Sequence, residues 1–248
     1  MSPFVALYLK ELKGIRLVSA VLLFGTGAIV LTVLSNAGDG GVHATMLLLL
    51  LPYLCPPALA GVLIHSITQE WAGRTQHQWL ALPVPRSSLM LAKLAAVASL
   101  GAGIFVLNTF GLHMIYEQVL DTVGVSQEIV FQPPPGFPTD SFKADDLWSC
   151  AAAMFGSITL LLLGLGLAAA VLKTVVARFK GLVTVAVFLG GLWLTESLGP
   201  AFSDLVGGGE TVSGVGLQAA VNAYLYLALM GAVFAAVGIF IFDRYVDA

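Results

Sequence analysis

The chain has 248 residues, of which 58% are hydrophobic and 10% are charged, with a formal net charge of −3 and a mean hydropathy of +0.94. Soluble domains carry about 25% charged residues, so this composition excludes an ordinary water-soluble globule. The sequence also lacks the basic patch that a nucleic-acid partner would require. Its two cysteines, Cys55 and Cys150, are too few for a disulfide framework or a metal cluster, and we interpret both as packing residues.

Long segments without Asp, Glu, Lys or Arg predict membrane-spanning helices. These charge-free segments are 17–38, 40–69, 94–116, 147–172 and 211–242. Each is long enough to cross about 30 Å of hydrocarbon as a helix of about 20 residues. A sixth apolar window, 181–195, is shorter and ends at Glu196. The sequence therefore predicts an all-α membrane protein with six transmembrane helices in one domain, 1–248.

Residues 1–16 predict an amphipathic helix that lies along the membrane surface, because their apolar positions repeat at helical spacing beside basic residues. These apolar positions are Phe4, Leu7, Tyr8 and Leu12. The predicted spans that follow are 17–35, 44–67, 89–116, 148–172, 182–199 and 219–242.

The second predicted span contains Pro52, Pro56 and Pro57. Three prolines in one helix must kink or break it, and the carbonyls that they free need partners inside a helix bundle. The bend is either a packing feature or a deformation point used in gating. Pro56 and Pro57 are therefore candidate gating residues.

Two outer segments are unusual. Residues 117–147 hold a proline-rich run, Gln132–Pro138, which predicts a semi-rigid extracytoplasmic loop. Residues 197–218 are rich in glycine and poor in polar side chains, so we expect re-entrant outer helices between spans five and six.

Basic residues predict the orientation. If the N-terminus is cytoplasmic, Lys143 is the one basic residue of 11 that falls outside, and the other ten (11 − 1) lie inside. This asymmetry is the one expected of cytoplasmic loops. It predicts a multi-pass membrane protein with both termini in the cytoplasm.

Polar residues inside spans are the natural place to look for function. Asn108 and His113 lie five residues apart in the third span and do not share a helix face closely. His113 either relays protons or substrate or makes an interhelical hydrogen bond. Glu196 is either a helix-end acid in contact with outside water or a cavity-facing carboxylate that binds cargo or caps the re-entrant segment. Asn108, His113 and Glu196 are thus candidates for a cargo path.

The sequence contains no phosphate-binding loop, no serine-nucleophile elbow and no zinc-protease motif. We therefore expect no catalytic residue, no metal and no cofactor bound by this chain. An intramembrane enzyme is disfavoured, and a self-contained secondary carrier would need more intramembrane ion-binding groups than the spans contain.

The most informative segment is a long polar insert, Thr68–Lys93, between the second and third spans. It includes a predicted coupling loop, 68–88. Glu70 and Arg74 are four residues apart and suit a helical ion pair. Trp71 and Trp79 suit interfacial anchors or plugs for a groove on a partner.

The end of the insert predicts a turn into the third span. Pro83 and Pro85 stop a helix and redirect the chain. Arg86 and Lys93 are expected to meet lipid phosphate or an acidic patch on a partner.

The pattern of this insert resembles that of permease subunits of type-two ATP-binding-cassette (ABC) exporters. The resemblance is carried by Glu70, Gly73, Thr75, Leu80, Leu82-Pro83-Val84, Arg86 and Lys93. Arg74 stands between the Gly and the Thr of that pattern, which is a departure from it.

The resemblance implies a dimer of permease subunits, identical or different, that binds two copies of a cytoplasmic ATPase carrying ATP and Mg. It implies that the insert forms a coupling helix against that ATPase. The implied coupling residues are Glu70, Trp71, Gly73, Arg74, Thr75, Trp79, Leu82, Pro83 and Arg86. It also implies an exported amphipathic cargo, such as an antimicrobial peptide, an antibiotic or a lipid-like molecule. Permeases of haem and cytochrome-maturation systems or of ion efflux remain alternatives.

Overall fold

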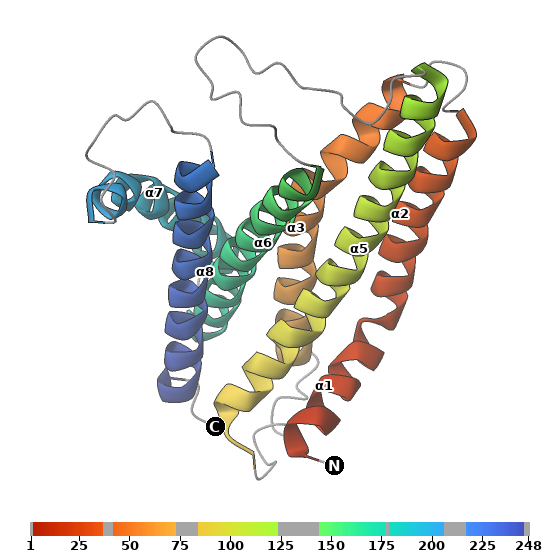
Figure 1. The fold of residues 1–248 in the computed structure, drawn as a ribbon. Helices are drawn as coiled ribbons and strands as arrows, with labels where there is room; N and C mark the ends of the chain where they lie inside the picture. Colours follow the sequence, from red (N-terminus) through yellow and green to blue (C-terminus); the bar gives the residue numbers. More distant parts are fainter. Residues whose placement is uncertain are drawn as a thin grey trace.

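The computed structural model describes residues 2–36, 42–72, 84–123, 144–176, 179–205 and 217–245, and these form helices and no strand. The helices are α1 (Pro3–Gly14), α2 (Arg16–Asn36), α3 (Val42–Ala72), α5 (Arg86–Val123), α6 (Ala144–Val175), α7 (Lys180–Leu205) and α8 (Leu217–Tyr245) (Figure 1). The all-α prediction is confirmed.

Several of these helices have the length and hydropathy of membrane spans. Within the described residues they are Arg86–Gly111, Ala151–Val175, Lys180–Phe202 and Asn222–Tyr245. The bent pair of α1 and the first part of α2, which meet at 64°, passes the same test when taken as one span. The lengths and hydropathies of these helices are therefore compatible with a membrane-embedded protein, although α3 is not among the segments that pass.

The helices extend beyond the spans predicted from hydropathy. The second predicted span ends at 67, but α3 continues to Ala72. The fifth ends at 199, but α7 continues through Pro200 to Leu205. Part of the glycine-rich segment is therefore helical, and the rest of it, 206–216, lies outside the described residues, as does the proline-rich run.

Residue pairs along the interfaces show that the six long helices alternate in direction. Helices α3 and α5 are antiparallel, because Leu59 lies at Gly101 and Glu70 contacts Lys93. Helices α5 and α6 are antiparallel, because Gly101 lies at Thr159 and Phe105 stacks on Phe155. Helices α7 and α8 are antiparallel, because Gly191 lies at Phe234 and Phe202 lies at Tyr226. Parallel order is given by Leu23–Gly103 and Val30–Gly111 for α2 and α5, and by Gly164–Gly231 and Ala168–Gly238 for α6 and α8. The start of α1 and the end of α8 consequently lie at the same end of the bundle, where the chain termini are marked in Figure 1. We call this the α1 end.

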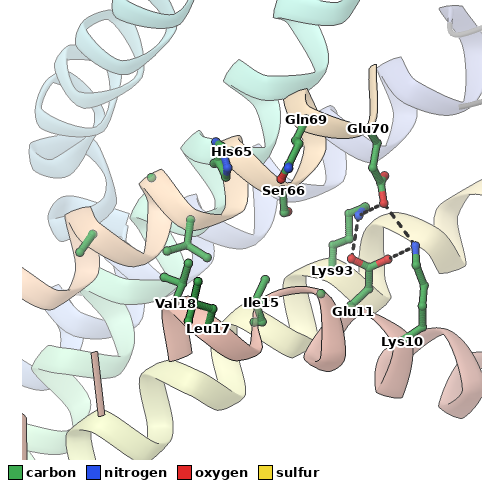
Figure 2. Close-up of a pocket in the computed structure, with 14 residues that line it drawn as sticks. Lys10, Glu11, Ile15, Leu17, Val18, His65, Ser66, Gln69, Glu70 and Lys93 are labelled. Atoms are coloured by element: carbon green, nitrogen blue, oxygen red, sulfur yellow. Dashed lines mark hydrogen bonds and ion pairs between the residues drawn. The ribbon is translucent and has the colours of Figure 1, made fainter. Parts of the chain in front are cut away.

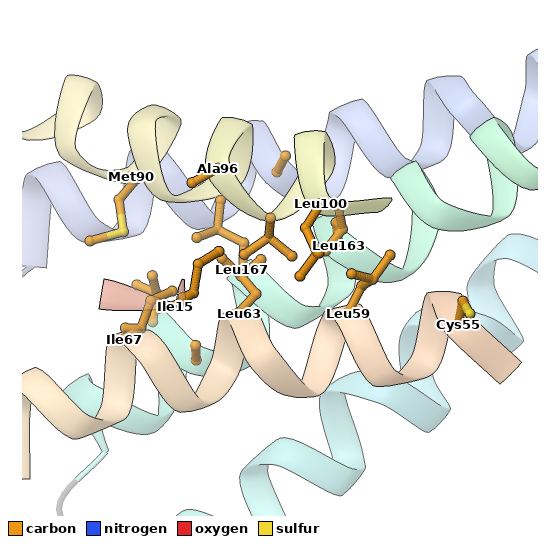
Figure 3. Close-up of a cluster of buried hydrophobic side chains, with 14 of the residues drawn as sticks. Ile15, Cys55, Leu59, Leu63, Ile67, Met90, Ala96, Leu100, Leu163 and Leu167 are labelled. Atoms are coloured by element: carbon orange, nitrogen blue, oxygen red, sulfur yellow. The ribbon is translucent and has the colours of Figure 1, made fainter. Parts of the chain in front are cut away.

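The main core lies where α3, α5 and α6 meet (Figure 3). Leu59, Leu63 and Ile67 follow each other at four-residue spacing on α3 and are almost completely buried. They pack with Leu163 and Leu167 of α6. Because all five side chains are apolar and interlocked, this core fixes α3 against α6.

Cys55 belongs to the same cluster as a buried free thiol, so its predicted packing role is confirmed. The side chain of Cys150 lies outside the described part of the structure.

Helices α6 and α8 approach each other through glycine. A Cβ atom on Gly164 would lie 2.1 Å from the carbonyl oxygen of Gly231, and one on Gly231 would lie 2.5 Å from the carbonyl carbon of Leu160. Small residues allow two backbones to pack this closely in a membrane, where dispersion contacts replace the hydrophobic effect between helices.

The prolines of α3 do not break it. The helix runs without interruption from Val42 to Ala72, and its ribbon changes direction along its length in Figure 1. Pro56 is buried in the bundle, whereas Pro57 is exposed. Bending at proline is the ordinary consequence of a lost backbone hydrogen bond.

Candidate functional site

Four charged side chains form a closed ring at the α1 end of the bundle (Figure 2). Lys93 Nζ lies 2.7 Å from Glu11 Oε2 and 2.9 Å from Glu70 Oε1. Lys10 Nζ lies 2.8 Å from Glu11 Oε1 and 3.2 Å from Glu70 Oε1. Each ammonium therefore contacts both carboxylates, and the charges cancel. We call Lys10, Glu11, Glu70 and Lys93 the charge ring.

Helix α1 delivers two members of the ring because one of its faces packs on α5. Leu7 is buried together with Leu89 and Ala92 of α5, and the hydroxyl oxygens of Tyr8 and Ser99 lie 3.0 Å apart. Ser2 precedes the first residue of the helix, and its hydroxyl accepts a hydrogen bond from the backbone amide of Val5, as expected of an N-cap residue.

The ring is buried on one side and open on the other. Lys93 is 3% exposed and Glu11 is 6% exposed, whereas the side chains of Glu70 and Lys10 are 25% and 37% exposed. Removing one partner of a buried pair typically costs about 3–5 kcal/mol, because the other charge stays buried. An exposed pair contributes only about 0–1 kcal/mol. The link between Glu11 and Lys93 is therefore the strong part of the ring.

The expectation that Lys93 meets lipid or a partner surface is wrong, because its ammonium is enclosed by two carboxylates of this chain. Glu11 was not predicted as a site residue at all. A signal for both was present in the sequence. Glu11 falls on the buried stripe of Leu7 and Ile15 at four-residue spacing, and Lys93 stands four residues after buried Leu89. Charges on an apolar stripe are buried only when they are paired.

The ring joins the two ends of the insert Thr68–Lys93 to each other. Glu70 lies in the last turns of α3, next to Trp71, which is partly buried against the core. Lys93 lies in the first turns of α5. The insert therefore leaves and re-enters the bundle at one charged junction.

Most of the predicted coupling residues fall between these two ends. Gly73, Arg74, Thr75, Trp79, Leu82 and Pro83 lie outside the described residues. The expected partner of Glu70, Arg74, therefore lies outside the described residues. Within them, Glu70 contacts Lys10 and Lys93.

Arg86 makes a contact within the chain. Its Nη1 donates a hydrogen bond of 3.4 Å to the backbone carbonyl of Asp243, near the end of α8. A cation there compensates the free carbonyls and the negative end of the helix dipole. Arg86 thereby connects the start of α5 to the last turn of α8.

A cleft of about 780 Å³ opens beside the charge ring, between the bend of α1 and α2 and one face of α3. Its wall is polar near the ring, at Ser66 and Gln69, and apolar away from it, at Leu17 and Val18 (Figure 2). A Cβ atom on Gly61 would meet nothing within 4 Å, so the cleft is open above this residue. We call this space the elbow cleft.

The predicted path residues are not brought together. Asn108 is 2% exposed, and its Oδ1 has no hydrogen-bond partner among the described residues. His113, on the same helix, is exposed. Glu196 is exposed inside α7, which continues to Leu205, so it does not stand at the end of its helix. Thr159 of α6 was not predicted, although its buried Oγ1 also lacks a partner in the described part of the chain.

Metal chemistry finds no support in the described ranges, where no group of three His, Cys, Asp or Glu side chains could hold a metal ion. Comparison with protein-family models, with curated proteins and with solved structures finds no match for this chain.

Proposed function

We propose that the chain is the membrane-spanning subunit of an ATP-driven exporter that receives force from a separate cytoplasmic ATPase through the insert Thr68–Lys93. The observation that carries the proposal is the charge ring, which closes the base of this insert and ties it to α1. The resemblance of the insert to the coupling segment of type-two ABC permeases supports the same role.

The ring favours force transmission because it makes three helices move as one at this end. A flexible insert joined to independent helices would dissipate a push from a partner. Here a displacement of the insert acts on Glu70 and Lys93 together, and through Glu11 on α1. The elements that would tilt as a unit are thus α1, the end of α3 and the start of α5.

The remaining features of the proposal follow from the same role. ATP and Mg bind to the ATPase, two copies of which serve two permease subunits. Six helices cross a bacterial inner membrane, with both termini in the cytoplasm. The elbow cleft, polar at one end and apolar at the other, has the chemistry that an amphipathic cargo requires.

Co-purification tests the proposal directly. The chain is expressed together with the ATP-binding protein encoded nearest to its gene, in wild-type form and with Arg74→Glu and Trp79→Ala in the insert. We expect the wild type to retain the ATPase and to stimulate its turnover, and the double variant to lose about tenfold or more in affinity, as is usual when an interfacial aromatic and a charge are both removed.

Lys13→Ala serves as the matched control, because Lys13 is exposed on α1 and lies outside both the insert and the charge ring. It should bind the ATPase like the wild type. Both proteins must reach the membrane in equal amounts. Equal retention of the ATPase by the wild type and the insert variant would refute docking through this segment.

A further inference from the structure

A second cleft, of about 600 Å³, lies between the end of α3 and the junction of α6 with α7. It is lined by His65, Thr68, Gln69, Trp71, Lys173, Thr174 and Lys180. None of these residues is acidic. We call it the basic cleft.

The two lysines of the basic cleft carry uncompensated charge. Within the described ranges, the ammonium groups of Lys173 and Lys180 have no ion-pair or hydrogen-bond partner. The elbow cleft differs in this respect, since its two lysines are matched by two glutamates. Two unpaired ammonium groups on one concave wall attract an anion.

The hydrogen-bonding groups on this wall restrict the kind of anion. The hydroxyls of Thr68 and Thr174 already donate to backbone carbonyls of their own helices, at 3.3 Å and 2.6 Å. The donors left are the two ammonium groups, the amide of Gln69 and the ring N–H groups of His65 and Trp71. Several N–H donors around a positive centre suit the oxygens of a phosphate. Lys180 is also the first residue of α7, so the positive end of that helix dipole lies at the cleft.

The position of the cleft along the helices points to a lipid. Lys173 stands near the end of the apolar segment Ala151–Val175, and Lys180 begins the apolar segment Lys180–Phe202. Both lysines therefore lie where apolar helix gives way to polar chain, which is the depth of phospholipid headgroups.

Exposed apolar side chains lie next to the two lysines along the chain. Val175 and Phe179 are 42% and 77% exposed, and acyl chains can cover this apolar surface while a headgroup occupies the cleft. A soluble anion would make no use of it.

We propose that the basic cleft binds an anionic phospholipid, with the headgroup phosphate at Lys173 and Lys180 and the acyl chains along the apolar side chains beside them, Val175 and Phe179. The site does not depend on a partner ATPase or on transport, and so it stands or falls independently of the exporter role.

Lipid retention measured by native mass spectrometry tests the site. The purified full-length protein is equilibrated in detergent with equal amounts of phosphatidylglycerol and phosphatidylcholine. The wild type is expected to retain phosphatidylglycerol with about thirtyfold preference, and the Lys173→Gln/Lys180→Gln variant to lose most of that preference, since each lysine near a lipid surface contributes about 1 kcal/mol.

Two further variants control this experiment. Lys13→Gln/Arg16→Gln removes the same amount of charge from exposed positions at the α1 end that line no part of the basic cleft, and it should keep the preference. Lys173→Arg/Lys180→Arg keeps the charge and should also retain it, which separates loss of binding from loss of folding.

Competition identifies the source of the phosphate. Inorganic phosphate at millimolar concentration should leave the retained phosphatidylglycerol largely in place, because it gains nothing from Val175 and Phe179. Complete displacement by inorganic phosphate, or no preference between the two lipids in the wild type, would overturn the proposal. Equal lipid retention by the wild type and the double glutamine variant would also overturn it. Loss of an acidic protein partner from that variant would then assign the cleft to a protein instead of a lipid.

Discussion

Replacement of Lys93 by methionine is the sharpest test of the charge ring. The substitution keeps the length of the side chain and removes the ammonium that contacts Glu11 at 2.7 Å and Glu70 at 2.9 Å. Glu11 then stays 6% exposed with Lys10 at 2.8 Å as its remaining partner in the ring. Because loss of one member of a buried pair typically costs about 3–5 kcal/mol, and Glu11 keeps one cation, we expect a loss of about 3 kcal/mol.

A double variant, Glu11→Leu/Lys93→Met, supplies the decisive comparison. It removes both buried charges and leaves the more exposed Lys10–Glu70 pair, which is 3.2 Å long. Replacing a buried ion pair by apolar side chains of similar volume is often neutral or stabilising. We therefore expect the double variant to be more stable than Lys93→Met alone, and the coupling energy between the two positions to exceed about 1 kcal/mol.

The assay is reversible unfolding in mixed micelles, followed by circular dichroism, with trypsin cleavage after Lys13 as a local probe of whether α1 has detached. Lys10→Met is the control, since that side chain is 37% exposed and its loss should cost about 1 kcal/mol or less. If Lys93→Met unfolds like the wild type and the cycle shows no coupling, the ring does not hold α1 in place.

Two further predictions concern the helix packing. Gly231→Val should destabilise the protein by at least about 1–3 kcal/mol, because its side chain would meet the backbone of Leu160 within 2.6 Å. Gly190→Val is the control, because a Cβ atom at Gly190 would meet nothing within 4 Å. It should change the unfolding midpoint in the same micelles much less. Thr159→Val, which removes a buried hydroxyl oxygen without a described partner and preserves shape, should leave the midpoint unchanged or raise it, by up to about 1 kcal/mol; a clear loss of stability would mean that this hydroxyl has a structural partner.

The elbow cleft and the basic cleft share a wall. His65 and Gln69, four residues apart on α3, line the elbow cleft and the basic cleft alike. A molecule bound in either cleft therefore contacts the end of α3 immediately before Glu70. Binding of a molecule in one cleft can in this way alter the contacts of the charge ring and of the other cleft.

Much of the architecture followed from local composition. A helix in a membrane must satisfy its backbone internally and cover itself with apolar side chains, so runs without charge predicted the long helices. The same reasoning placed the ends of some helices too early. The polar residues after 67 appeared to end the second span, whereas α3 continues to Ala72 because Glu70 is neutralised by lysines from two other helices.

The site itself required the tertiary structure. The sequence showed that Glu70 and Lys93 bound a polar insert, but their contact depends on α3 and α5 packing antiparallel, and the place of Glu11 depends on the 64° bend after α1. Burial of a charge is a property of several helices together, since its desolvation is tolerable only where an opposite charge arrives from elsewhere in the chain. Hydropathy is local and was readable from the sequence. The pairing of four charges from three helices was decided by the fold.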